Sequence, residues 1–184
     1  MGKHRIRLRA AVVEARTLAQ PVLPPTREEF LTRIRNCLLD AVDSGVLASS
    51  PSDIFRLLKH EFQEEGDGTR IVTVFGGASL DKGQATDEFF VKADGTRISF
   101  GITALYPRAV PPTLRAYRFH LRYADGSNPR YVRIDLNRGS GGDALVEPRS
   151  HVHIGAERLR VPVPIMTPVE ILEKYLYGLP LPPP

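Results

Sequence analysis

Three runs in the second half of the chain alternate apolar and polar side chains with a period of two. The first run divides into an apolar and a polar set: Tyr117, Phe119, Leu121 and Tyr123, and then Arg118, His120 and Arg122. Successive side chains of a β-strand point to opposite faces of its sheet. This run therefore predicts a strand with one face toward a core and one face that carries cations and an imidazole.

Two later runs repeat the alternation. Their apolar positions are Val132, Ile134 and Leu136, followed by Val152 and Ile154. The polar positions opposite them are Tyr131, Arg133 and Asp135, followed by His151 and His153. If the three strands are neighbours, all the polar positions share one outward surface. The sequence thus predicts a sheet face rich in arginine and histidine.

Other signals fit an antiparallel sheet with helices. Residues 70–75 are rich in β-branched side chains and predict a strand. Asp94 and Gly95 are a hairpin signal between predicted strands at 88–92 and 97–102. A capping box at Thr167–Glu170 predicts a closing helix that ends at Gly178.

Two further helix starts precede the strands. Thr26–Glu29 has the spacing of a capping box, and Ser50–Asp53 places a proline at the first helical position. Apolar side chains follow at helical spacing: Phe30, Ile34, Cys37, Leu38 and Ala41, and then Ile54, Leu57, Leu58 and Phe62. Gly45 and Gly66 are the predicted helix ends, so the pair predicts an αα-hairpin.

The predicted fold class is therefore α+β. We expect an antiparallel β-sheet of five to seven strands with helices on one face, preceded by an N-terminal αα-hairpin. The predicted organisation has four parts: a basic arm and proline-rich linker (1–25), the helical hairpin (26–66), the sheet with its closing helix (67–178) and a disordered proline-rich tail (179–184).

Composition narrows the setting. The formal net charge of +4 is compatible with an anionic partner. The single cysteine, Cys37, excludes an internal disulfide and favours a reducing, cytoplasmic location, and its place on a helical apolar stripe predicts packing rather than chemistry. The first residues do not form a secretory signal, and no run approaches the roughly 20 apolar residues of a membrane span, so we expect no membrane association.

The predicted polar face suggests acid–base chemistry on RNA without a metal or cofactor. Metal-free cleavage needs a base for the 2′-hydroxyl, an acid for the leaving oxygen and cations for the developing charge. His120 with His151 or His153 is the candidate acid–base pair. The candidate phosphate-binding residues are Arg118, Arg122, Arg133 and Tyr131, and Asp135 would orient an imidazole or bind Arg133.

Two alternatives stay open. The first is a metal-dependent hydrolase, in which His151 and His153 bind zinc with His120 and with help from Glu147 or Asp135. Neighbouring arginines argue against that site, because a cation-rich surface disfavours another cation. The second alternative is a module that binds nucleic acid or an acidic partner without chemistry. A serine-hydrolase mechanism is excluded, because the chain has no Gly-x-Ser-x-Gly motif.

Residues 88–178 also carry, in order, the features of a known family. They are Asp94–Gly95, Tyr117–His120, Arg133–Asn137, Arg149–His153 and Pro168–Leu172. In this order the segment resembles the TumE-like family of prokaryotic toxins from toxin–antitoxin loci. The resemblance implies a cytoplasmic toxin that a cognate antitoxin protein neutralises. Action on RNA is then the function expected from the histidines and arginines above.

Overall fold

The structure is a computed structural model, and it describes residues 20–77, 88–137, 149–156 and 158–179. These residues form an α+β fold with an eight-stranded antiparallel sheet and three α-helices. The predicted fold class is confirmed, although the sheet has one strand more than the largest number predicted. The predicted basic arm up to residue 19 and the predicted tail from residue 180 lie outside the described residues.

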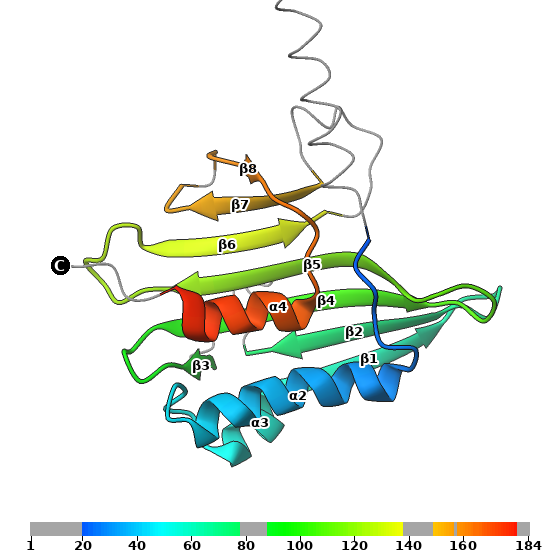
Figure 1. Ribbon diagram of the computed structural model, residues 1–184, viewed down its shortest axis with the longest axis horizontal. Helices are drawn as coiled ribbons and strands as arrows, with labels where there is room; N and C mark the ends of the chain where they lie inside the picture. Colours follow the sequence, from blue (N-terminus) through cyan, green and yellow to red (C-terminus); the bar gives the residue numbers. More distant parts are fainter. Residues whose placement is uncertain (1–19, 78–87, 138–148, 157, 180–184) are drawn as a thin grey trace, which may run out of the picture.

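The strands follow one another in space almost in chain order (Figure 1). The path through the sheet is β1-β2-β4-β5-β6-β7-β8, and the short strand β3 pairs with β4. The bounds are β1 Leu58–Glu64, β2 Arg70–Gly76, β3 Phe90–Val91, β4 Arg97–Tyr106, β5 Thr113–Arg122, β6 Tyr131–Leu136, β7 Ser150–Ile154 and β8 Val161–Pro162.

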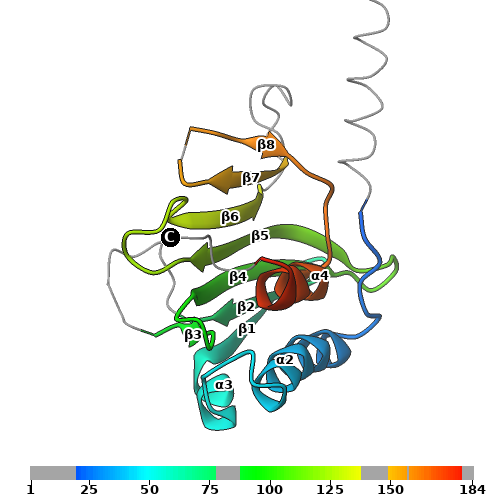
Figure 2. The same cartoon turned by 60° about the vertical axis from the view of Figure 1, so that its left-hand side comes forward.

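Helices α2 (Arg27–Asp43) and α4 (Pro168–Glu173) lie on the same side of the sheet in both views (Figures 1 and 2). Helix α3 (Pro51–Leu57) follows α2, and the π-helical turn η2 (Lys174–Gly178) continues α4. The cap of α2 is Thr26, whose hydroxyl accepts from the Glu29 N–H at 3.2 Å. None of these helices has the length and apolar character needed to cross a membrane.

The apolar side of the sheet packs under these helices. The predicted apolar set of this run is buried: Tyr117, Phe119 and Leu121 of β5, and Tyr123 directly after it. Helix α2 adds Phe30, Ile34 and Leu38 to the same core. Tyr175 of η2 is fully buried, and its hydroxyl lies 3.0 Å from the carbonyl oxygen of Phe119 and 3.3 Å from that of Val132. The opposite side, which we call the open face, carries no helix of the described residues.

The predicted αα-hairpin over 26–66 is wrong in its second half. Helix α3 ends at Leu57, and Leu58–Glu64 is strand β1. All seven residues of β1 pair with β2. Because β2 is rich in β-branched residues and would otherwise expose a bare edge, strand pairing outweighs the helical spacing of Leu58 and Phe62. The sheet therefore begins at residue 58, and α2 shares its core instead of forming a separate unit.

The two edges of the sheet differ. Strand β1 forms one edge with seven residues, of which Lys59 to Glu64 are exposed. At the other edge β8 has two residues, and its Pro162 has no N–H to donate. Proline is one of the means by which proteins blunt a sheet edge. Among the described strands, β1 is thus the edge with a full row of backbone donors and acceptors.

The Tyr175 hydroxyl gives a test of this packing. We expect Tyr175→Phe to lower the free energy of unfolding by about 1–2 kcal/mol at neutral pH, because a buried hydrogen bond is lost. Burial raises the pKa of Tyr175 well above its ordinary value. Above about pH 10 the unfolded chain therefore releases this proton while the folded chain keeps it, so stability falls as pH rises.

The variant has no Tyr175 proton to release, so its free energy of unfolding falls less than that of the wild type as the pH rises. Urea unfolding of both proteins at neutral pH and at about pH 10.5 measures it, and the difference between them should shrink at the higher pH. An equal difference at both pH values would contradict the assignment.

Candidate functional site

Strand register brings all eight predicted site residues to the open face. Directly opposite residues on neighbouring antiparallel strands point to the same face. Arg118 of β5 stands opposite Asp135 of β6, which stands opposite His151 of β7. A second row holds His120, Arg133 and His153, and a third pairs Arg122 with Tyr131. We call this group the polar cluster: Arg118, His120, Arg122, Tyr131, Arg133, Asp135, His151 and His153.

The polar cluster is more buried along β7 than the alternation predicted. His151 and His153 are 2% and 1% exposed, whereas the apolar Ile154 of the same strand is 45% exposed. β7 is an interior strand between β6 and β8, and the ring centroids of its two imidazoles lie 4.8 Å apart. These two imidazoles lie on the predicted side of the sheet, but the expectation that they are exposed there is wrong. The partly or fully exposed members lie on β5 and β6: Arg118, His120, Arg122, Tyr131 and Arg133.

Asp135 is held between two arginines. Its side chain is 6% exposed, and Oδ2 accepts a hydrogen bond from Nε of Arg133 at 2.8 Å. On the other side, Nε of Arg118 lies 3.4 Å from Oδ1. A buried carboxylate needs such partners, because its desolvation is otherwise not offset. The predicted pairing of Asp135 with Arg133 is confirmed.

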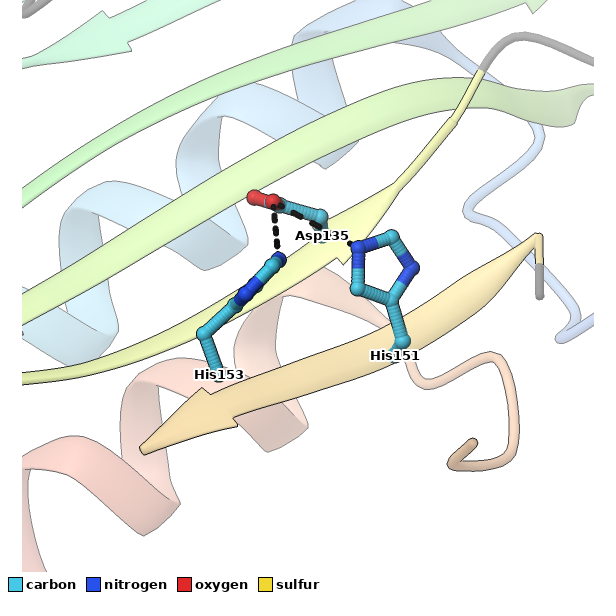
Figure 3. Close-up of side chains that lie close together, drawn as sticks. All are labelled: Asp135, His151 and His153. Atoms are coloured by element: carbon cyan, nitrogen blue, oxygen red, sulfur yellow. Dashed lines mark ion pairs between the residues drawn. The ribbon is translucent and has the colours of Figure 1, made fainter. Parts of the chain in front are cut away.

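His153 has two competing neighbours at one ring nitrogen. An arginine can only donate, so the 2.9 Å contact between Nη2 of Arg133 and Nε2 of His153 is a hydrogen bond when the ring carries its proton on Nδ1, a buried atom without a hydrogen-bond partner among the described residues. Oδ2 of Asp135 lies 3.4 Å from the same nitrogen, and Oδ2 lies 3.8 Å from Nε2 of His151 (Figure 3). The contact with Asp135 is a hydrogen bond only when Nε2 is protonated, which excludes the bond from Arg133. Of the two, we take the shorter contact with Arg133 as the hydrogen bond.

His120 is oriented by an aromatic neighbour. Its ring meets the Tyr131 ring edge to face, with 5.2 Å between the centroids and an interplanar angle of 87°. In register it stands between Ser99 of β4 and Arg133 of β6. His120 is half-buried, so it is the imidazole of the polar cluster with the most access to solvent.

Asp135, His151 and His153 have the chemistry of a metal site. One ligand atom from each lies within 4.8 Å of the others, and two imidazoles with a carboxylate suit zinc or iron. However, Arg133 uses the lone pair of His153 that a metal would need, and two guanidiniums flank the carboxylate. The surroundings therefore fit an anion better than a cation.

The predicted metal set also differs from this group. His120 is not among its members, and Glu147 lies outside the described residues. A metal-dependent hydrolase stays a prediction, which elemental analysis of the purified protein tests.

Cys37 takes no part in the chemistry of this face. It lies in α2 and is buried against the core. Burial, with further contributions from Glu173 and Asp40, raises the pKa of its thiol to about 12. Such a thiol is protonated at neutral pH and is not a nucleophile.

Sequence reasoning missed three residues of the open face. Arg97 of β4 stands directly opposite Arg122, and both are exposed. Phe75 of β2 stands opposite Gly101, which in turn stands opposite Arg118. In the sequence, Arg97 and Ser99 alternate with Ile98 and Phe100, and this alternation is the local signal that places Arg97 on the polar side of its strand. Only the register of β2, β4 and β5 places these residues beside the polar cluster.

Comparisons with protein-family models, with curated proteins and with solved structures found no match to this chain. The resemblance to TumE-like toxins thus stays a prediction that rests on the order of motifs between residues 88 and 178.

Asp135 offers a test of the charge arrangement. We expect Asp135→Asn to lower the free energy of unfolding by about 3 kcal/mol, because Arg133 is left partly buried without its counter-ion. The matched control is Glu61→Gln, which removes an exposed carboxylate from the same face on β1 and should change stability by less than about 0.5 kcal/mol. Urea unfolding measures both, and equal small losses would mean that the buried ion pair does not stabilise the fold.

Proposed function

We propose that the protein binds RNA along the open face of its sheet. The observation that supports this most directly is the exposed pair of Arg97 and Arg122, which stand directly opposite each other on β4 and β5. Like charges in such a position destabilise a sheet. The destabilisation is relieved when an anion lies across both guanidiniums, and the phosphates of a nucleic acid are such anions.

The surroundings of this pair favour the same ligand. Arg118 and Arg133 lie on the same face, and both are positioned by Asp135. A guanidinium that is already held in place loses less conformational entropy when it binds. Tyr131 stands opposite Arg122 and adds an aromatic ring. Aromatic and basic side chains on an open antiparallel sheet are a recurrent means of binding single-stranded RNA.

The resemblance to TumE-like toxins gives this proposal a biological setting. The resemblance implies a cytoplasmic toxin that is neutralised by a cognate antitoxin protein, and the cations of the open face add RNA as its target. The same cations also suit an acidic antitoxin, so competition between RNA and such a protein for the open face is expected. Induced expression in bacteria tests the setting, with growth arrest that depends on Arg122 as the expected result.

Cleavage of the bound RNA is a second candidate function, and the position of His120 favours it. His120 is the least buried imidazole of the polar cluster and stands directly opposite Arg133, but its Nε2 is enclosed. In this role Nδ1 takes the proton of a 2′-hydroxyl that attacks the neighbouring phosphorus. The arginines stabilise the charge on the phosphorane, and a water molecule protonates the departing 5′-oxygen. His151 and His153 were predicted for that role, but their burial suits them better to holding Asp135 and Arg133.

Arg122→Glu separates binding from stability. The new carboxylate stands opposite Arg97, so we expect the variant to be more stable by about 0.2–1 kcal/mol. Its affinity for a single-stranded RNA oligonucleotide should fall at least tenfold, and the slope of log K against log salt should shrink by roughly one. Fluorescence anisotropy at several salt concentrations and thermal unfolding measure the two effects.

The control is Arg35→Glu, which makes the same charge change on α2, where the guanidinium lies 5.6 Å from the Phe55 ring. It should leave RNA affinity nearly unchanged. If both variants lose affinity equally, binding reflects overall charge and the open face is not the site.

His120→Ala tests cleavage. We expect it to abolish the shortening of a labelled RNA in the presence of a chelator while RNA binding stays within about threefold, because the general base is lost and the cations remain. His60→Ala, which removes an exposed imidazole from β1, is the control. Cleavage that survives in His120→Ala would leave binding without chemistry as the function.

A further inference from the structure

The open face is hollowed next to the polar cluster. A depression of about 440 Å³ lies over β2, β4 and β5, with Phe75, Gly101 and Arg118 among its lining residues. These three are consecutive members of one row across the sheet, because Phe75 pairs with Gly101 and Gly101 with Arg118. The row therefore presents an aromatic ring, a gap and a guanidinium side by side.

Gly101 leaves this gap because it has no side chain, and its backbone conformation does not require a glycine. Its backbone φ is not in the left-handed region, so other residues could occupy the position. A Cβ placed there would meet only Cδ1 of Phe75, at an ordinary contact distance of 3.9 Å. Glycine inside a strand weakens the sheet and often marks a place where a ligand approaches the backbone closely. The missing side chain thus leaves room for a flat group against the Phe75 ring.

The rest of the depression suits a polar, planar ligand. Thr73 and Thr103 stand opposite each other and line it, and each hydroxyl can donate or accept a hydrogen bond. Phe75 is only partly buried, and the Arg118 side chain is 45% exposed. A nucleotide matches this set. Its base has an aromatic face and polar edges, and its ribose carries a phosphate on each side.

We propose that the depression binds one unpaired nucleobase, stacked on Phe75, with an adjacent phosphate at Arg118. This inference rests on the proposed RNA binding and narrows its ligand to single-stranded RNA. Bases inside a duplex are stacked on each other and do not offer a face to Phe75. Because every base has such a face, and because the threonine hydroxyls adapt to either donors or acceptors, the subsite tolerates any base.

Phe75→Ala tests the stacking. We expect its affinity for a single-stranded oligonucleotide to fall by between about 5-fold and 150-fold, the range measured for the loss of one stacked base. The slope of log K against log salt should not change, since no cation is removed. Phe55→Ala, which removes a 60% exposed phenylalanine from α3, is the matched control and should bind as the wild type does.

Two further variants keep the test independent of folding defects. Phe75→Trp introduces the sole tryptophan, since the chain has none, and its fluorescence should be quenched by single-stranded RNA but not by a duplex. Gly101→Val fills the gap and should weaken binding as Phe75→Ala does. Circular dichroism confirms that each variant is folded.

The outcomes separate this inference from the proposed function. A wild-type protein that binds no RNA overturns both. A wild-type protein that binds RNA in an Arg122-dependent way, while Phe75→Ala binds equally well and Phe75→Trp shows no quenching, overturns the nucleobase subsite alone. Equal affinity of the wild type for duplex and single-stranded RNA also overturns the nucleobase subsite alone. If Gly101→Val and Phe75→Ala instead abolish association between two copies of the chain, the depression is a protein contact.

Discussion

Directly opposed antiparallel pairs carry the assignment of side chains to one face or the other from β1 to β7, except where the register of β4 and β5 shifts between Thr103 and Ala104. One row illustrates this, since it crosses six strands: Lys59, Phe75, Gly101, Arg118, Asp135 and His151. Burying Phe119 beneath α4 and η2 therefore fixes the side of nearly every other strand residue. The core and the polar cluster are two results of one constraint, because each apolar residue turned toward the helices turns its neighbours toward the open face.

Asp135 allows the polar cluster to hold several arginines close together. Its carboxylate neutralises part of the charge of Arg118 and Arg133 and holds both guanidiniums in defined positions. The histidines of β7 then fill the space behind it, and His153 accepts a hydrogen bond from Arg133. Structure and binding are thus linked, because the group that stabilises the interior of the cluster also positions its outer cations. Such preorganisation favours binding of a ligand whose charges match the positions of the cations.

The sequence predicted what depends on local period and caps, and it failed where distant pairing decides. Alternation assigned both faces of β5 and β6, and N-cap and proline signals located the starts of α2, α3 and α4. It did not predict β1, because Leu58 and Phe62 also fit a helical stripe and only the edge of β2 decides between them. It did not predict that His151 and His153 are buried, since alternation gives the side of a strand and not the depth. Phe75 and Gly101 were missed because a gap beside a ring exists only once β2 and β4 are paired.

The unequal edges of the sheet limit how the molecule can associate. A fibre built by strand addition needs two adhesive edges on each copy, and here Pro162 blunts one of them. If two copies pair through β1, the remaining edge of each is the proline-bearing β8, so growth ends with a closed dimer. Within one copy, β2 and β4 separate β1 from β5, β6 and β7 (Figure 1). In such a dimer the two copies of β5 to β7 would therefore lie toward opposite ends of one continuous sheet. Two separate stretches of one polyanion could then be held at a fixed spacing.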